Sequence, residues 1–247
     1  MATTQDIRAI IALGDSITAG FGLIDHYVID GIHEYRGMSF TAGGLETAWT
    51  MPNLMRVVNG GRKLLGTSEK TGLPWDVLEI RGRHIRPFDP EVNQLNAAQS
   101  NARSRHLAEQ VDYLLHRLKS YPGLDVAQDW KVLTIFIGAN DICDSCNDSK
   151  IHSSLDAYDR MVRQQLERIR AAVPRVFVNL IGYFNITQTF DFTKDDKYCV
   201  FVHHAIHECD CCFGKTATAA TRRVMDDFTF ALNERCVWFV NSCIHCR

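Results

Sequence analysis

The sequence predicts an α/β fold with a mostly parallel β-sheet, because apolar runs of strand length alternate with amphipathic segments of helix length. Strands separated by helices are joined by right-handed crossovers, which place helices on both faces of such a sheet. The strand candidates are residues 7–13, 94–98, 131–137, 175–181 and, more weakly, 236–240. The helix candidates are residues 47–58, 103–119, 155–172 and 216–235.

Length and composition favour one folded domain. The chain has 247 residues, of which 46% are hydrophobic and 23% are charged, as is typical of a globular protein with a sizeable core. It contains no internal repeat, low-complexity tract or long linker. We therefore expect residues 1–247 to form a single domain.

Charge and hydropathy exclude two classes of partner. With 27 Lys and Arg against 29 Asp and Glu, the chain has no positive excess to neutralise a nucleic acid or an anionic membrane surface. We interpret the densest basic stretch, RGRHIRPF at 81–88, as a solvated loop. The longest apolar runs, such as 132–139, are too short for a transmembrane segment.

Polar residues follow three of the predicted strands. Ser16 comes directly after the first strand, in ALGDSITAG, and is either a nucleophile or a turn residue. Ser100 and Asn101 follow the second strand, and Gly138 and Asn140 follow the strongest one. Because functional residues of parallel sheets collect at the carboxyl ends of the strands, these side chains are expected at one edge. A hydroxyl beside amide and backbone N–H donors fits acyl transfer. In that reaction a serine attacks the carbonyl carbon, and the donors stabilise the oxyanion that develops.

Three stretches in this order, ALGDSITAG, NAAQSNARS and FIGANDICDSCND, resemble successive sequence blocks of the GDSL, or SGNH, family of ester hydrolases. The phospholipase B-like branch is the most similar, through EYRGMSFTAGG, VPRVFVNLIGYFNI and the Cys-rich YCVFVHHAIHECDCC. The resemblance covers about residues 7 to 235. It implies a three-layer α/β/α, flavodoxin-like fold and hydrolysis of lipid or other acyl esters without a cofactor.

Carried over position by position, the resemblance makes Ser16 the nucleophile and its own N–H one oxyanion donor. The side chain of Asn140 is the second donor. The third is usually the N–H of a glycine, and Asn101 stands there instead. A backbone N–H survives that change, and asparagine tolerates left-handed dihedral angles. We expect Ser16, Asn101 and Asn140 to converge, with Ser16 Oγ within a few ångströms of the Asn140 amide.

The general base is the main departure from the family, which uses a D-x-x-H block near the C-terminus. From about residue 236 the chain no longer resembles the family and contains no such block, as if truncated or replaced. We interpret DGIH at 30–33 as a chance match. We expect slow ester hydrolysis or, as an alternative, a non-catalytic lipid-binding remnant. The remaining histidines considered and not assigned as base are His203, His204, His207 and His245.

Nine cysteines, all in the second half of the chain, indicate disulfides. We predict a bond between Cys143 and Cys146 that staples the loop after Asn140. Further bonds are expected among Cys199, Cys209, Cys211 and Cys212. The cysteines, the two N-glycosylation sequons at Asn147 and Asn185, and the family resemblance together indicate a secreted or lumenal glycoprotein. The N-terminus, however, has no signal-peptide pattern.

A zinc protein is the rival reading from another class. Cys143–Cys146 and Cys243–Cys246 are two C-x-x-C pairs, and four thiolates at such spacing can share one tetrahedral ion. Nearly a hundred residues of α/β sequence separate the pairs, which weakens this reading. We therefore expect no metal site.

Overall fold

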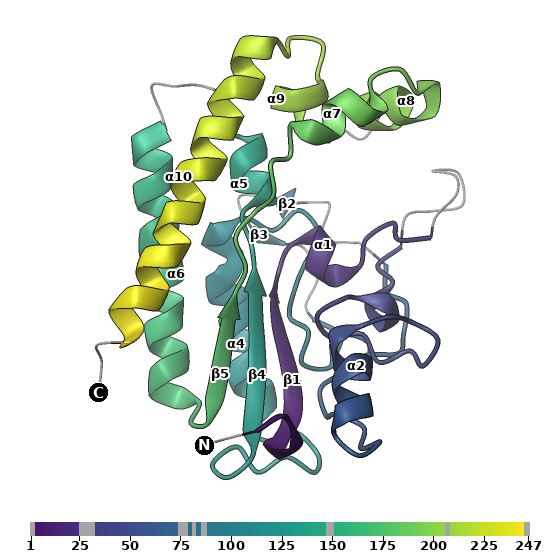
Figure 1. Cartoon of the computed structure of the whole chain (residues 1–247), viewed down its shortest axis with the longest axis vertical. Helices are drawn as coiled ribbons and strands as arrows, with labels where there is room; N and C mark the ends of the chain where they lie inside the picture. Colours follow the sequence, from purple (N-terminus) through teal and green to yellow (C-terminus); the bar gives the residue numbers. More distant parts are fainter. Residues whose placement is uncertain are drawn as a thin grey trace. The chain divides into compact units, whose positions relative to one another are not determined.

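The computed structural model describes residues 3–24, 33–73, 79–80, 83–84, 88–146, 151–205 and 208–244 (Figure 1). The strands are β1 (Ile7–Gly14), β2 (Glu79–Ile80), β3 (Arg83–His84), β4 (Trp130–Phe136) and β5 (Val176–Leu180). The helices are α1 (Ser16–Ala19), α2 (Met51–Val58), α3 (Pro90–Asn93), α4 (Leu107–Leu118), α5 (Ala139–Cys143), α6 (Ile151–Ala172), α7 (Gln188–Thr193), α8 (Lys197–Ala205), α9 (Asp210–Phe213) and α10 (Ala219–Ile244). Short 3-10 helices cover Thr4–Asp6, Arg36–Met38 and Ser104–His106.

The chain divides into two compact units. The first comprises Met1–Ile137 and Gln164–Leu180, and the second Gly138–Arg163 and Ile181–Arg247. The boundary falls directly after β4 and β5 and within α6. The expectation that residues 1–247 form a single domain stays a prediction.

A parallel sheet in the order β1-β4-β5 forms the centre of the first unit (Figure 1). Gly14 at the end of β1 pairs with Phe136 at the end of β4, and Ile135 pairs with Leu180 at the end of β5. The three strands therefore end at the same edge of the sheet. This confirms the predicted α/β class and the strands predicted at 7–13, 131–137 and 175–181.

The free edge of β1 carries two short segments in place of a full strand. Ile10 N donates to Leu65 O at 2.9 Å, and further along β1 Ala97 N donates to Ala12 O at 2.8 Å. The predicted strand 94–98 is thus reduced to a parallel bridge between Ala12 and Asn96. It stays short because Leu65 already occupies the first half of this edge.

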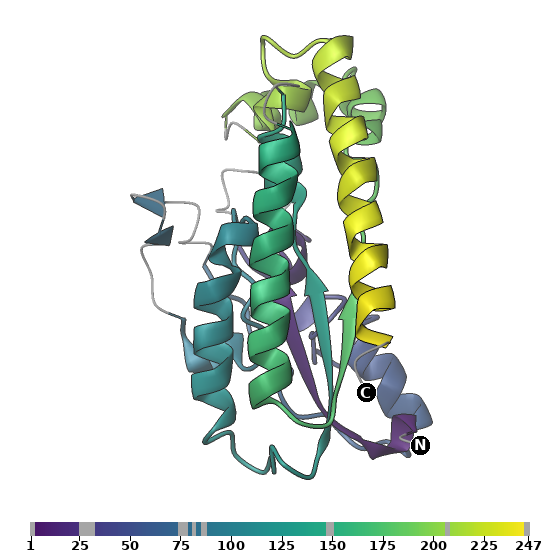
Figure 2. The same ribbon diagram turned by 90° about the vertical axis from the view of Figure 1, so that its left-hand side faces the viewer.

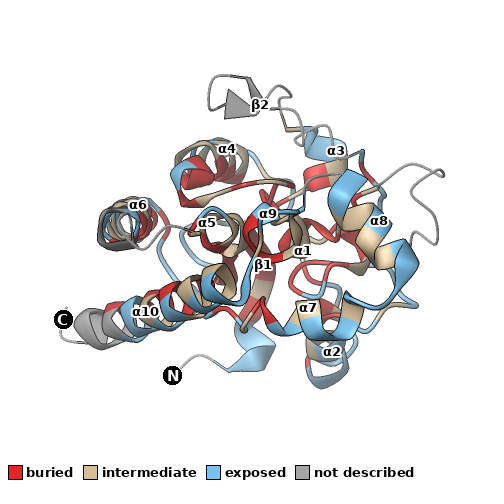
Figure 3. Ribbon diagram, turned by 90° about the horizontal axis from the view of Figure 1, so that it is seen from above, coloured by how far each residue is buried: buried red, intermediate tan, exposed pale blue. Residues whose placement is uncertain are grey.

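Helices cover both faces of the sheet in the first unit. Figure 2 shows α4 and α2 on opposite sides of the strands. Met51 and Met55 of α2 pack against Ile10 and Val132 in one cluster. Residues of β1 alternate between the two faces, so Ile11, which neighbours Ile10, points to the other one. These three layers explain why every residue of β1 except Arg8 is buried. Figure 3, seen from above, marks the buried residues around β1 in red.

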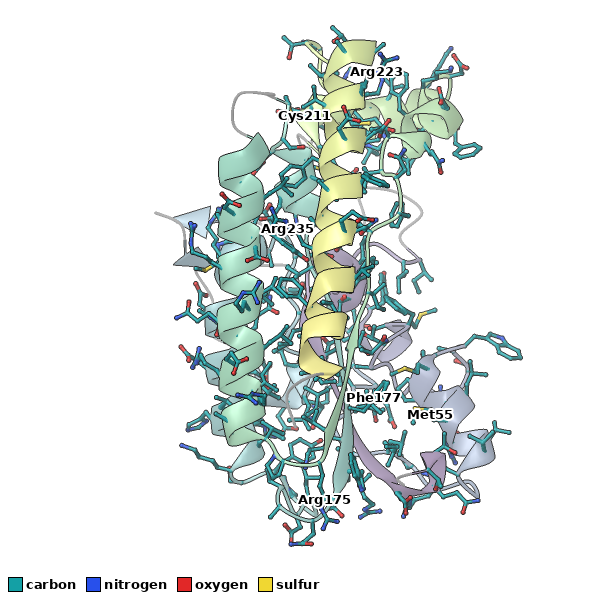
Figure 4. The ribbon with its side chains drawn as sticks, turned by 60° about the vertical axis from the view of Figure 1, so that its left-hand side comes forward. Met55, Arg175, Phe177, Cys211, Arg223 and Arg235 are labelled. Atoms are coloured by element: carbon teal, nitrogen blue, oxygen red, sulfur yellow. A yellow bond between two sulfur atoms is a disulfide. The ribbon has the colours of Figure 1, made fainter. Side chains whose placement is uncertain are left out.

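Helix α10 dominates the second unit. Its buried residues recur every three or four positions, as Met225, Phe228, Leu232, Cys236 and Phe239. Figure 4 shows Arg235 on α10, and its guanidinium lies 3.8 Å from a carboxylate oxygen of Asp156 on α6.

The predicted strand 236–240 is wrong, because the burial of Cys236 and Phe239 continues the helical period of α10 past residue 235. The helices predicted at 47–58, 103–119, 155–172 and 216–235 are confirmed as α2, α4, α6 and α10. Their ends shift by a few residues, except that α10 continues to Ile244. In the part of the chain that the structure describes, no helix is both long and apolar enough to cross a membrane.

Candidate active site

Ser16 lies at the carboxyl end of β1, as the first residue of α1. The strand ends at Gly14, and Asp15 caps the helix by accepting a hydrogen bond from Ile17 N at 3.1 Å. Gly14 has no room for a side chain, because a Cβ there would lie 2.4 Å from Phe136 O and 2.5 Å from Thr18 Oγ1. This close approach between β1, α1 and β4 fixes the position of the serine.

Polar side chains brace the turn around Ser16. The buried amide of Gln110 on α4 accepts from Gly14 N at 2.9 Å and donates to Gly14 O at 2.7 Å. The carbonyl of Thr18 accepts from Ser39 Oγ at 2.7 Å and from Asn96 Nδ2 at 3.0 Å. A helix of four residues has little stability of its own, so these contacts hold α1 in place. Sequence reasoning missed Gln110, which lies on the apolar face of a predicted helix and carries no motif.

Asn101 lies in a loop that runs beside the turn of Ser16. Gln99 N donates to Gly14 O at 3.2 Å. Ser16 comes two residues after Gly14, and Asn101 comes two residues after Gln99. Ser16 and Asn101 thus both lie near the carboxyl end of β1. Neither their N–H groups nor the Ser16 hydroxyl makes a hydrogen bond within the described residues. Two backbone donors therefore remain available at this strand end.

The side chain of Asn101 is turned toward Arg103. The backbone of Asn101 is left-handed, with φ of 62°. Arg103 Nη1 donates to Asn101 O at 3.2 Å and to Asn101 Oδ1 at 3.1 Å. Asparagine therefore replaces the expected glycine without losing the left-handed conformation, and the guanidinium fixes its amide side chain.

Asn140 belongs to the second unit, where it is the second residue of α5. Gly138 before it has φ of 139°, and a Cβ there would lie 3.2 Å from Leu232 Cδ1 and 3.3 Å from Tyr183 Cε2. The glycine thus lets the chain turn from β4 into α5 beside these side chains. The meeting of Asn140 with Ser16 and Asn101 stays a prediction.

The predicted Cys143–Cys146 disulfide is wrong. Cys143 is bonded to Cys209 and Cys146 to Cys211, so two bonds join the end of α5 and the residues just after it to the segment around α9. Figure 4 shows Cys211 in this part of the second unit. Each bond closes a loop of more than 60 residues in the unfolded chain, which restricts it far more than a three-residue loop would. The presence of disulfides is confirmed. The bonds predicted among Cys199, Cys209, Cys211 and Cys212 are wrong, because Cys209 and Cys211 pair with Cys143 and Cys146, and Cys199 and Cys212 are free thiols.

The alternative zinc site would lack two of its four thiolate ligands, because the sulfurs of Cys143 and Cys146 are disulfide-bonded. The side chain of Cys243 and all of Cys246 lie outside the described residues. Over the described ranges, no group of three or more His, Cys, Asp or Glu is placed to hold a metal ion. Cys199, Cys212 and Cys236 are free thiols, and burial raises the pKa of Cys212 to about 11, which keeps it protonated and unreactive near neutral pH.

Histidines of the Cys-rich region make structural contacts. His203 Nδ1 lies 2.9 Å from Glu208 Oε2, and its ring stacks on Phe213 with centroids 3.8 Å apart. His204 Nε2 lies 3.1 Å from Phe213 O. Both rings are therefore engaged in holding α8 against α9, and neither is assigned as a base. His207, His245, Asp30 of DGIH and the sequon residue Asn147 lie outside the described residues.

Comparison with known proteins identifies the family of the chain. Residues 10–226 match the family described as GDSL-like Lipase/Acylhydrolase. The chain is 37% identical over 189 residues to "Phospholipase B1, membrane-associated" of Rattus norvegicus and 35% identical over 187 residues to that of Homo sapiens. These matches cover 73% and 74% of this chain and 12% of each relative. The chain thus spans a small part of the length of its relatives, and it belongs to the GDSL-like lipase/acylhydrolase family.

Proposed function

We propose that this chain is a serine ester hydrolase of the lipase or phospholipase B type, acting on acyl esters of lipids. The observation that carries the proposal is the hydrogen bond from Gln99 N to Gly14 O, which joins the turn before Ser16 to the loop that leads to Asn101. The phospholipase names of the relatives support the choice of a lipid ester as substrate.

The proposed reaction is acyl transfer to Ser16. Its Oγ attacks the ester carbonyl carbon and loses its proton to a base, while the carbonyl oxygen becomes an oxyanion. The N–H groups of Ser16 and Asn101, joined by the side chain of Asn140, donate hydrogen bonds to that oxyanion. Collapse of the intermediate releases the alcohol, and water then hydrolyses the acyl-serine to free acid.

The general base that takes the proton of Ser16 determines the rate of the proposed ester hydrolysis. Within residues 1–247 no D-x-x-H block follows Asn140, and His203 and His204 are held in structural contacts. Removing the base from a serine hydrolase costs roughly 10⁴ to 10⁶ in rate. We therefore propose that this 247-residue polypeptide hydrolyses esters slowly, with residual catalysis from the oxyanion donors.

A short-chain nitrophenyl ester tests this proposal in three proteins: the chain itself, Ser16→Ala, and the chain extended by a terminus that carries the family's D-x-x-H block. We expect near-background rates for the first two and recovery for the third. Vigorous Ser16-dependent turnover by the unextended chain would contradict the missing base. A fully inactive extension that still binds lipid would favour the non-catalytic remnant.

The disulfides are relevant to the cellular compartment in which the protein folds. Two bonds in the second unit and the named relatives support a protein that folds in the secretory pathway or outside the cell. Asn185 of the second sequon accepts a hydrogen bond from Thr187 Oγ1 at 3.0 Å. Glycosylation at Asn185 and Asn147 stays a prediction, which the mass shift on treatment with an N-glycosidase would test.

A further inference from the structure

A buried ion pair lies beneath the loop that carries Asn101. Glu34 and Arg36, in the segment between α1 and α2, are each only 2% exposed. Glu34 Oε2 accepts hydrogen bonds from Arg36 Nε at 2.9 Å and from Arg36 Nη2 at 2.6 Å. Such a pair is weak evidence for stability, because desolvating two charges offsets their attraction. Its contacts with the loop therefore need another explanation.

Both members of the pair bind the loop. Glu34 Oε1 accepts from Ser100 N at 3.1 Å and from Ser100 Oγ at 2.6 Å. Arg36 Nη1 donates to Asn96 O at 3.0 Å, and Arg36 Nη2 donates to Ala98 O at 2.7 Å. The pair thus fixes the orientation of successive peptide groups up to the residue just before Asn101.

The backbone of Glu34 is itself paired with another segment of the first unit. Glu34 N donates to Gly72 O at 2.9 Å, and Gly72 N donates to Glu34 O at 2.7 Å. The carboxylate is therefore anchored by its backbone, and Ser100 is held by a group that cannot easily follow it. The peptide group between Ser100 and Asn101 carries the N–H of Asn101. Contacts that fix the position of Ser100 therefore also fix the direction in which that N–H points.

We propose that Glu34 and Arg36 are positioning residues for the oxyanion hole, acting through Ser100 on the N–H of Asn101. This inference rests on the proposed function. A donor stabilises an oxyanion only where it is preorganised, and a misplacement of about 1 Å can cost roughly 100-fold in rate. Because the donor acts on charge that develops in the transition state, its displacement lowers kcat rather than raising KM.

Ser100→Ala is the sharpest variant, because it removes the hydroxyl contact with Glu34 and leaves the ion pair in place. An alkylboronic acid, butylboronic acid, forms a tetrahedral adduct with a nucleophilic serine and places an oxygen where the oxyanion develops. We expect Ser100→Ala to bind it about 10-fold more weakly than the unmodified chain, as followed by ¹¹B NMR. In the D-x-x-H extended chain, we expect kcat about 10-fold lower and KM within about 2-fold.

Thr50→Ala is the matched control. Thr50 also lies buried in the first unit, and its Oγ1 donates to Gly43 O at 2.7 Å, at the start of α2. We expect a similar loss of melting temperature with unchanged boronate affinity and kcat. If folded Ser100→Ala and Thr50→Ala behave alike in both assays, the positioning role is wrong. If Ser16→Ala still forms the adduct, the proposed nucleophile itself is wrong, and the positioning role falls with it.

Discussion

Asn101 shows how a single residue departs from a family pattern without losing the chemistry of its position. The oxyanion donor proposed there is a backbone N–H, which every residue except proline supplies. The left-handed φ of 62° is the real constraint, and asparagine is among the residues that tolerate it. The hydrogen bond from Arg103 Nη1 to Asn101 Oδ1 then fixes the orientation of the asparagine side chain.

Two substitutions separate backbone from side chain at Asn101. Asn101→Ala should lower the free energy of unfolding by about 1–2 kcal/mol, because an ordinary L-residue is strained in the left-handed region. Asn101→Gly should change it by less than about 1 kcal/mol, since relief of strain offsets the entropy of the unfolded chain. Both variants lose the Arg103 contact with Asn101 Oδ1 and keep the one with the backbone oxygen, so urea unfolding compares the backbone effect alone. Equal losses would contradict this explanation.

Tyr113 on α4 predicts a pH dependence. Its ring stacks on Phe88, its hydroxyl donates to Gln94 O at 2.7 Å, and burial raises its pKa to about 12. The unfolded tyrosine ionises near pH 10, so the folded state binds more protons between pH 10 and 12. Its contribution is fully present below pH 10 and is lost as pH rises toward 12.

Tyr113→Phe tests this sign. We expect its urea midpoint to fall less steeply between pH 10 and 12 than that of the unmodified chain, because other ionisable groups contribute equally to both. The slope from one such group cannot exceed about 1.4 kcal/mol per pH unit. Identical slopes would show that Tyr113 titrates as in water.

Among the elements, the two misjudged strands have the same cause. Short apolar runs do not by themselves distinguish a strand from part of a helix or an irregular segment. At 236–240 the preceding helical stripe continues, and at 94–98 the neighbouring edge of β1 is already shared with Leu65. Longer periodic segments, such as α4 and α6, were predictable because their burial pattern repeats over several turns.

Two phenylalanines of α10 test its buried stripe. Phe228 is fully buried, whereas Phe230 is 70% exposed. Phe228→Ala should cost about 3–5 kcal/mol of unfolding free energy through lost burial and a cavity, and Phe230→Ala should cost less than about 0.5 kcal/mol. Thermal unfolding measures both. Similar costs would mean that α10 packs through another face.

The disulfide pairing makes a separate prediction for α5 and α9. Mapping of peptides without reduction should recover Cys143 with Cys209 and Cys146 with Cys211. The double variant Cys209→Ser with Cys211→Ser should lower the free energy of unfolding by at least about 2–4 kcal/mol, because the long loop in the unfolded chain is released only when both bonds are absent. Cys199→Ser, at a free thiol, is the control and should change little. A peptide linking Cys143 to Cys146 would contradict the structure.

At the scale of the whole molecule, the residues proposed to act in catalysis could be named from the sequence, whereas the residues that hold their segments in place could not. Ser16 and Asn101 follow strands, and strand ends are visible in the hydrophobic pattern. Glu34, Arg36 and Gln110 act through contacts between segments far apart in the chain, and no local pattern announces a buried ion pair or a buried amide. The disulfide partners were hidden for the same reason, since spacing along the chain does not determine which cysteines meet.

The most direct test of the account is a crystal structure of the chain with butylboronic acid. The proposed function predicts boron bonded to Ser16 Oγ, with one boronate oxygen within hydrogen-bonding distance of Ser16 N, Asn101 N and the Asn140 side-chain amide. Asn140 lying far from the boronate, at another edge of the sheet, would contradict the three-donor oxyanion hole. A boronate that ignores Ser16 would contradict the nucleophile.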